Sequence, residues 1–430
     1  MAGEWIKCTL ADACSSIDYG LTASASEERA GPKFLRITDI VTGHINWNTV
    51  PHVAIDDSTA AKYRLCEGDI VLARTGASTG TSAYVKCPPL AVFASYLVRL
   101  QAKPEFDARY LAYYLRSADF WTFIRGVLGD KSAQPNASAS TMTKAPLRAP
   151  KDKAEQRAIA HILGTLDDKI ELNRQMSQTL EEMARAIYKS WFVDFDPVRA
   201  KCRGEPMCSP PIGQAHRPAP TDWHLPQHIL DLFPDRLVDS ELGEIPEGWG
   251  VRTLGELLEL AYGKALKADV RQHGTIPVYG SNGQVGWHDE KLVIGPGVIV
   301  GRKGNPGVVK WVPTDFFPID TTFYVVPKDR CPSLKFLFYA LQLQDLASLS
   351  ADSAVPGLNR NIAYMSSQIL PSRAILAAFD AAIQPLFQRI NEADREARTL
   401  AALRDSLLPK LLSGEIRVKD AERFLKERGL

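Results

Sequence analysis

The sequence predicts an α+β fold with two mixed α/β domains, two long coiled-coil helices and an internal repeat. Three observations support this prediction. The same order of features occurs in both halves of the 430 residues. Each half begins with short β-rich runs broken by glycine and proline. Each half ends in a long stretch whose apolar residues recur at close to heptad spacing.

The repeat is visible from the start of each half. Trp5, Thr9-Leu10 and Tyr19-Gly20 recur in the same order as Trp249, Thr253-Leu254 and Tyr262-Gly263. Two later pairs of segments also keep their order, 68–76 with 297–304 and 109–115 with 335–341. Chance hydrophobic patterning would not preserve this order across two whole halves, which indicates a duplication.

In the last part of each half the match has a constant offset of 220 residues. The matched positions in the first half are Leu166, Ile170, Thr179, Leu180, Met183, Ile187 and Phe192. Those in the second half are Leu386, Ile390, Thr399, Leu400, Leu403, Leu407 and Leu412. The long stretches are therefore two copies of one element.

Short runs rich in β-branched and aromatic residues predict strands in both mixed regions. These runs are 70–76, 83–87, 96–102, 298–304, 308–312 and 321–327. Large apolar residues at three- and four-residue spacing predict helices at 108–124 and 333–346. Their aromatic residues, 110–123 and 336–339, resemble base-stacking platforms, but the helical spacing favours core packing.

Residues 154–192 contain no proline, and their balanced charges are typical of a solvated face beside an apolar seam. The stripe in this first helix is Leu166, Ile170, Met176, Leu180, Met183 and Ile187. The second helix, 373–413, has its stripe at Leu386, Ile390, Leu400, Leu403 and Leu407. Each helix needs the other, or a partner protein, to cover this stripe. Pro385 is expected to mark a kink or the start of the second helix.

These patterns give a domain order along the chain. A first mixed domain, 1–150, is followed by a long helix, 151–195, and a proline-rich connector, 196–248, with local turns. A second mixed domain, 249–371, is followed by a second long helix, 372–415, and a C-terminal tail, 416–430.

Composition sets limits on function. The net charge of +1 gives no overall basic signature, so a nucleic-acid-binding protein of this kind concentrates its positive charge locally or shares phosphate contacts with a partner. The seven scattered cysteines fit reduced thiols, and we expect a cytoplasmic protein without a membrane span or secretory leader. The spacing of Cys202, Cys208 and His216 matches no zinc pattern, so no metal is expected.

Catalytic motifs are missing from the sequence. The glycine-rich segment 295–301 lacks the lysine and hydroxyl of a phosphate-binding loop. No Asn/Asp-Pro-Pro-aromatic tetrapeptide, HExxH or GxSxG occurs. Asp167 and Asp168 are adjacent on a predicted helix and so point in different directions, which favours a solvated face or a partner contact over catalysis. We expect no catalytic residue in this chain.

Two segments resemble a known family. Residues 154–198 resemble the central conserved region of the DNA-specificity subunits of type I restriction–modification systems, and 232–249 (LFPDRLVDSELGEIPEGW) is similar to the run that leads into their second target-recognition domain. The resemblance covers the full architecture, so that 1–150 and 249–371 correspond to target-recognition domains. It also implies that the two long helices pack antiparallel, which separates the two domains and gives the internal repeat a pseudo-twofold axis. These domains match more weakly, because the family varies them to change the DNA sequence that is read.

The resemblance implies a non-catalytic DNA-binding subunit in which each target-recognition domain reads one half of a bipartite site. It implies that the helices dock two modification (methyltransferase) subunits, which bind S-adenosylmethionine and methylate adenine N6. Restriction (translocase/nuclease) subunits, which use ATP and Mg, would complete the complex. No cofactor is expected on this chain itself.

The predicted helix length agrees with that arrangement. A 39-residue helix is about 58 Å long, which suffices to separate two major-groove readers by one DNA turn of roughly 34 Å. The helix pair is therefore expected to set the spacing between the half-sites.

Loop chemistry suggests which residues contact DNA. Glycine-bordered loops after two predicted strands offer basic and small polar side chains, and a further turn offers amides that suit adenine. The candidates are Arg74, Thr75, Ser78, Thr79, Tyr279, Asn282, Gln284, Arg302, Lys303 and Asn305. Each loop is also consistent with an ordinary surface hairpin.

Two other functions remain open at this point. The chain could be the recognition subunit of another multi-subunit restriction enzyme, or a coiled-coil interaction protein that organises partners without reading sequence. A self-contained methyltransferase or nuclease is disfavoured by the missing motifs.

Overall fold

The computed structural model describes residues 4–26, 30–128, 136–203, 225–351 and 357–427. The chain divides into two compact units. Unit 1 consists of residues 1–173 and 395–430, and unit 2 of residues 174–394. Each unit therefore contains one mixed α/β region and one end of each long helix.

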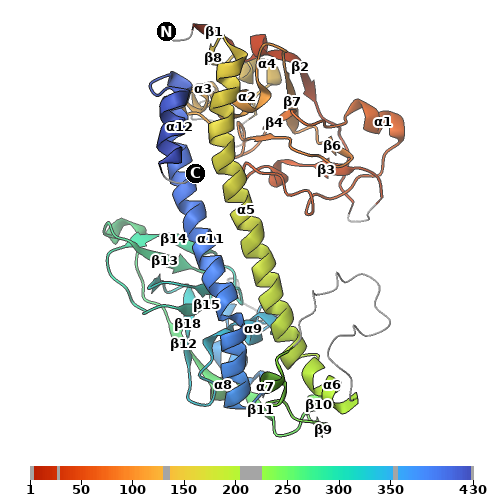
Figure 1. Cartoon of the computed structure of the whole chain (residues 1–430), viewed down its shortest axis with the longest axis vertical. Helices are drawn as coiled ribbons and strands as arrows, with labels where there is room; N and C mark the ends of the chain where they lie inside the picture. The colour runs from red at the N-terminus through yellow and green to blue at the C-terminus, as the bar shows by residue number, and fades with distance from the viewer. Residues whose placement is uncertain (1–3, 27–29, 129–135, 204–224, 352–356, 428–430) are drawn as a thin grey trace. The chain divides into compact units, whose positions relative to one another are not determined.

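The two long helices are present as the sequence predicts. They are α5 (Lys153–Phe192) and α11 (Arg373–Ser413), shown in Figure 1. Each passes without a break from one unit into the other. Of the two expectations for Pro385, a helix start is wrong, because α11 begins at Arg373 and continues through the proline. A kink at Pro385 stays a prediction.

The helices pair in antiparallel fashion within each unit. In unit 1 the first part of α5 contacts the last part of α11, where Asp167 Oδ1 lies 2.6 Å from Arg404 Nη1. In unit 2 the end of α5 meets the start of α11, where the rings of Phe192 and Phe379 lie 5.0 Å apart. Leu166, Leu400 and Leu407 are buried in the core of unit 1. The predicted coiled-coil pairing is thus present in both units.

The seam between the helices differs from the predicted stripe at its centre. Asn173 and Ser177 are buried there, whereas Met176 is only half-buried. The Asn173 amide donates to Glu396 at 2.8 Å, and the Ser177 hydroxyl donates to Asp394 at 3.1 Å. Heptad spacing from Leu166 selects Asn173 and Ser177, and polar residues at such positions fix the register of paired helices.

The other predicted stripe residues lie on either side of this polar centre. Ile390 is buried, while Ile170 and Leu403 pack on the core of unit 1 and Ile187 and Leu386 on that of unit 2. Leu180 and Met183 are half-buried.

Unit 1 builds its mixed region from three strand groups. A four-stranded sheet has the order β2-β7-β4-β5, an antiparallel pair joins β1 to β8, and a parallel pair joins β3 to β6. Their bounds are β1 Trp5–Thr9, β2 Cys14–Tyr19, β3 Lys33–Leu35, β4 Ile70–Ala73, β5 Ser82–Tyr84, β6 Ala91–Phe93, β7 Leu97–Ala102 and β8 Pro146–Pro150.

Unit 2 repeats this topology with one added strand. Its sheet has the order β12-β18-β15-β16, its antiparallel pair is β11–β21, and its parallel pair is β13–β17, extended by β14. Their bounds are β11 Gly250–Thr253, β12 Leu258–Tyr262, β13 Ile276–Gly280, β14 Gly283–His288, β15 Gly297–Gly301, β16 Val309–Val312, β17 Phe317–Pro318, β18 Thr322–Pro327 and β21 Ser367–Leu370. The predicted internal repeat is confirmed at the level of strand order.

Helices cover these sheets. Unit 1 has α1 (Asp57–Lys62), α2 (Ala108–Tyr114), α3 (Ala118–Leu128) and α4 (Ala139–Met142), and unit 2 has α8 (Leu254–Leu257), α9 (Leu334–Leu343) and α10 (Arg360–Met365). The single helix predicted at 108–124 is wrong, since the Ser117 hydroxyl caps a new helix by accepting from the Phe120 N–H. Tyr110, Phe120 and Phe336 are buried, so the predicted core role of the aromatic residues is confirmed.

The range 196–248 contains more regular structure than its proline content predicts. It includes α6 (Asp196–Arg203), α7 (Gln227–Leu230) and the hairpin of β9 (Leu237–Ser240) and β10 (Gly243–Pro246). A separate short pair, β19 (Ser350–Ala351) and β20 (Gly357–Leu358), lies later in unit 2. Phe233 is buried against Trp191 at 5.2 Å between ring centres. Apolar residues among the prolines therefore attach this segment to the core of unit 2.

The C-terminal tail forms α12 (Val418–Lys426), with Ala421 buried in the core of unit 1. Cys208 and His216 lie outside the described residues, and the Cys202 thiol donates to the Asp235 carbonyl at 2.8 Å. Across the described ranges no cluster of His, Cys, Asp or Glu could hold a metal ion. Nor is any described helix long and apolar enough to cross a membrane.

Asp167 ties the long helices to the mixed region of unit 1. Its carboxylate accepts hydrogen bonds from Tyr113 Oη and Arg116 Nη1, both at 2.7 Å, and from Arg404 Nη1 of α11 at 2.6 Å. Burial opposes ionisation, but Arg116 and Arg404 outweigh it and lower the pKa of Asp167. The expectation of a solvated face or partner contact is therefore wrong for Asp167. Asp168 is half-exposed and pairs with Arg109.

The equivalent position in unit 2 holds Phe387, which packs on Trp311 at 4.8 Å between ring centres. Phe387 also contacts Phe338 and Tyr339. The two copies thus join the helix pair to the sheet region by different chemistry, an ionic network in unit 1 and an aromatic cluster in unit 2.

We predict that Asp167→Asn destabilises the protein by about 1.5–3 kcal/mol, because it removes the buried anion that Arg116 and Arg404 share and leaves Arg404 only the exposed Asp405. Urea unfolding at neutral pH measures this loss. The matched control is Asp168→Asn, whose partly exposed ion pairs should contribute only about 0–1 kcal/mol. Equal losses for the two variants would contradict the buried network.

The difference between wild type and Asp167→Asn should also depend on pH. The folded pKa of Asp167 lies below its ordinary value of 3.8, so its stabilisation is complete above that pH and is lost as pH falls through the folded pKa. The gap should therefore shrink on acidification below about pH 4.

Candidate nucleic-acid interface

In unit 1 an arginine lies over an exposed tyrosine at the ends of β2 and β4, the two strands that flank β7 in the sheet. The guanidinium of Arg74, which follows β4, lies 4.9 Å from the ring centre of Tyr19 at the end of β2. The Tyr19 side chain remains 44% exposed, so this pair is not core packing. Arg74 Nη2 also contacts Asn136 Oδ1 at 3.4 Å.

Unit 2 repeats the arrangement with Arg302 and Tyr262. The guanidinium of Arg302, which follows β15, lies 4.8 Å from the ring centre of Tyr262 at the end of β12, and Tyr262 is 47% exposed. A second guanidinium, that of Arg360, lies 4.8 Å from the same ring. We call the pairs Tyr19–Arg74 and Tyr262–Arg302 the Arg–Tyr stacks.

The same backbone contacts hold both stacks. The Arg74 N–H donates to the Tyr96 carbonyl at 3.0 Å, and the Arg302 N–H donates to the Thr321 carbonyl at 2.9 Å. Their own carbonyls accept from Ala137 and Leu358 at 3.0 and 2.9 Å. The stacks therefore occupy equivalent, fixed places in the two units.

Glycines next to the stacks are required by geometry. Gly20 follows Tyr19, and a Cβ atom there would lie 2.3 Å from the Ala94 carbonyl oxygen. A Cβ on Gly263, which follows Tyr262, would lie 2.2 Å from the Ile319 carbonyl oxygen. Two residues after each arginine, Gly76 and Gly304 have φ of 75° and 82°, a conformation that favours glycine.

The loop that follows Arg74 provides few free polar groups. Thr79 is buried and its hydroxyl donates to the Gly76 carbonyl at 2.7 Å, so this predicted DNA contact serves the loop itself. Thr75 and Ser78 are half-buried.

In unit 2 the structure brings two predicted loops together. Asn282, in the β13–β14 turn, accepts a hydrogen bond from the Asn305 side chain, and both residues are exposed. Lys310 Nζ donates to the Asn282 carbonyl at 3.0 Å. We call Asn282 and Asn305 the amide pair.

The remaining predicted residues of unit 2 differ in exposure. Lys303 and Gln284 are exposed, and Gln284 contacts the Gly286 carbonyl at 3.4 Å. Tyr279 packs on Phe316 at 6.2 Å between ring centres and belongs to the sheet.

Tyr19, Tyr262, Asn136 and Arg360 were not among the residues that loop chemistry selected. The repeated Tyr-Gly dipeptide was the available signal for the two tyrosines, because it recurs at matching positions in both halves. For Arg360 and Asn136 the local sequence gives no comparable signal.

Two other arginines of unit 1 are neutralised by carboxylates. Arg99 pairs with Asp18 at 2.8 Å, and Arg116 pairs with Asp167 at 2.7 Å. Within the parts of the chain that the structure describes, Arg74, Arg302 and Arg360 form no ion pair with a carboxylate. Positive charge is therefore available at the two stacks for an external anion.

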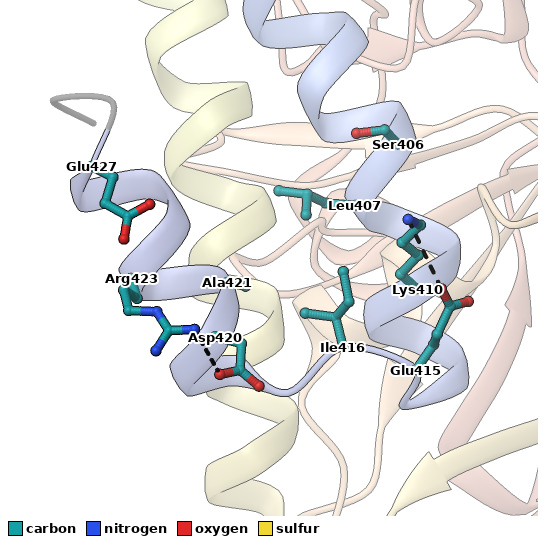
Figure 2. A pocket seen from close by; sticks show the side chains of 9 residues that line it. All are labelled: Ser406, Leu407, Lys410, Glu415, Ile416, Asp420, Ala421, Arg423 and Glu427. Carbon is teal, nitrogen blue, oxygen red and sulfur yellow. Dashed lines mark ion pairs between the residues drawn. The ribbon is translucent and has the colours of Figure 1, made fainter.

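A cavity of about 560 Å³ lies elsewhere in unit 1, between the end of α11 and α12 (Figure 2). Ion pairs join Lys410 to Glu415 at 3.9 Å and Arg423 to Asp420 at 3.6 Å along its lining. With Glu427 also present, the lining holds more acidic than basic groups, which disfavours DNA phosphate.

Comparison with known proteins identifies relatives over most of the chain. A family model described as "Type I restriction modification DNA specificity domain" matches residues 3–182 and 246–362. The chain is 28% identical over 338 residues to the type I restriction enzyme HindI specificity subunit of Haemophilus influenzae, covering 66% of this chain and 71% of that protein. It is 23% identical to the MjaIX specificity subunit of Methanocaldococcus jannaschii, covering 73% and 70%.

Among solved structures, the fold is similar to that of the S subunit of a type I restriction–modification system from M. genitalium. The TM-score is 0.55 at 17% identity, and the match covers 95% of this chain and 96% of the other. This likeness supports the fold described above, with two mixed regions and two long helices.

We predict that Gly20→Ala destabilises unit 1 by about 2 kcal/mol, because the new Cβ overlaps the Ala94 carbonyl and must displace the end of β2. Thermal unfolding measures this change. Gly126→Ala in α3 is the matched control, since nothing lies within 4 Å of its Cβ and alanine favours a helix. Similar melting temperatures for the two variants would show that the backbone does not approach Gly20 as closely as described.

Proposed function

Because the chain belongs to the family of type I restriction–modification DNA-specificity proteins, whose members are DNA-recognition rather than catalytic subunits, we propose that it reads a bipartite DNA site, one half with each unit. The observation that carries this proposal is the repetition of one recognition fold. The two units share their strand order and present an Arg–Tyr stack at the same place. Two copies of one DNA-binding surface suit a site in two parts.

The long helices have two roles in this proposal. Paired α5 and α11 set the number of unspecified base pairs between the half-sites, since both run continuously from one unit into the other. They also position two methyltransferase subunits, which supply S-adenosylmethionine chemistry at adenine N6, and nuclease/translocase subunits, which use ATP and Mg. The complex acts on double-stranded DNA in the cytoplasm.

The contacts of the adjacent carboxylates Asp167 and Asp168 in α5 support a non-catalytic role. Asp167 is held by Tyr113, Arg116 and Arg404, and Asp168 by Lys86 and Arg109. Both are therefore engaged in positioning elements of unit 1 rather than arranged around a common reacting atom.

We predict that the chain directs adenine methylation to a two-part motif. It would be co-expressed with the modification subunit of its own genome in a host that lacks N6-methyladenine, and methylated positions would be mapped by single-molecule sequencing. A motif with two specified halves and a fixed unspecified gap is expected, and it should disappear when this chain is omitted.

Other outcomes point to the alternatives. A one-part motif would contradict reading by two units. Methylation without any sequence preference would instead indicate a coiled-coil protein that organises partners and reads no sequence.

We further predict that lengthening both helices lengthens the gap. Seven residues would be inserted in α5 near 174–178 and in α11 near 394–398, which keeps the heptad register and adds about 10 Å. The gap should grow by about three base pairs with both half-sites unchanged. The length-neutral control changes the exposed Gln175 and Gln178 to Ala and should keep the original gap. Altered half-site sequences would contradict this role for the helices.

A further inference from the structure

The two units can be compared position by position around the stacks, and some features are shared while others differ. The shared features are an exposed tyrosine, an arginine over its ring and a left-handed glycine two residues after that arginine. The position after that glycine differs, being Ala77 in unit 1 and Asn305 in unit 2. The amide pair is therefore specific to unit 2.

Shared and differing features suit different parts of DNA. The two halves of a bipartite site carry different bases, but B-form DNA places phosphates in the same geometry in both. A contact that both units keep thus fits the phosphate backbone, which positions the protein without reading sequence. An uncharged amide found in one unit alone fits base edges better than phosphate, and Asn is the residue type that pairs with adenine N6 and N7.

Charge around Tyr262 supports an anion at the stack. Arg302 and Arg360 both lie 4.8 Å from the ring centre, so two cations share one exposed aromatic side chain. Their visible partners are neutral carbonyls, that of Asp320 at 3.1 Å for Arg302 and that of Leu260 at 3.5 Å for Arg360. Because both cations lie beside one ring they repel each other, and a phosphate bound near them would offset that repulsion.

We propose that the two Arg–Tyr stacks bind DNA phosphates and that the amide pair of unit 2 reads bases, an inference that rests on the proposed function. Tyr19 and Tyr262 hold the guanidinium planes of Arg74 and Arg302 in a fixed orientation at the rim of each sheet. Arg360 adds a second cation in unit 2. Asn282 and Asn305 present amides to base edges of the half-site that unit 2 reads.

The test uses the assembled complex of this chain with its modification subunits. DNA affinity would be measured over a range of salt concentrations, and the preferred motif would be selected from a randomised DNA library. The variants are Arg74→Ala, Arg302→Ala, Arg360→Ala and the double variant Asn282→Ala with Asn305→Ala. Arg330→Ala is the matched control, because Arg330 already pairs with Glu256 on the surface of unit 2.

Each arginine variant should weaken binding to every sequence alike and lower the slope of log affinity against log salt by about 1. The selected motif should stay the same. The amide variant should keep the wild-type salt slope but lose about 10- to 100-fold discrimination in one half-site only. The control should change neither quantity.

The variant Arg302→Lys distinguishes a phosphate contact through positive charge from a purely structural role of Arg302. It keeps the cation, so it should restore most of the salt slope that Arg302→Ala loses, whereas a merely structural role for the stack would leave both variants equally impaired.

Three results would overturn the assignment. A changed motif in an arginine variant would make that arginine a base contact, and an unchanged salt slope would remove the phosphate contact. An unchanged motif in the amide variant would remove the reading role of Asn282 and Asn305. A wild-type complex that selects no two-part motif would instead overturn the proposed function itself.

Discussion

The antiparallel pairing of α5 with α11 is the interaction on which the rest of the structure depends. Each helix has an apolar stripe that must be covered, and the ends of the two stripes are buried within different units. Unit 1 is closed by residues 395–430, which lie far along the chain from residues 1–173. Each unit therefore contains segments from both halves of the sequence, and its core is complete only when both long helices are in place.

The seam also explains how the pairing acquires a defined register. Its apolar parts could slide by a heptad at modest cost, because leucines and isoleucines are interchangeable there. The buried Asn173 and Ser177 are different, since their hydrogen bonds to Glu396 and Asp394 form in one alignment only. A buried polar group without a partner is costly, so the polar centre penalises every other register. In the proposed function, a helix pair that sets the spacing between half-sites needs a defined register more than it needs maximal stability.

Duplication followed by divergence is visible in both structural and candidate binding residues. Position 167 holds a carboxylate that bridges three elements of unit 1, while its repeat partner, Phe387, joins an aromatic cluster. Both the ionic network and the aromatic cluster attach the helix pair to the mixed region of their unit. The attachment is kept in the two copies, whereas the type of interaction differs. The Arg–Tyr stacks show the opposite behaviour, because the same residue types persist at exposed places where packing alone does not demand them. We take persistence at an exposed site as the mark of a common ligand.

The sequence by itself determined the fold class, the internal repeat and the extent of the long helices. These features depend on local periodicity and on the order of motifs, which are properties of the chain read in one dimension. Only the tertiary structure decided which residues the fold brings together. Tyr19 and Arg74 lie at the ends of different strands. Asn282 and Asn305 lie in two different loops, and no sequence spacing indicates that these loops meet. The buried places of Asn173, Ser177 and Asp167 also escaped prediction, because a search for apolar stripes discards polar residues whose burial depends on partners distant in sequence.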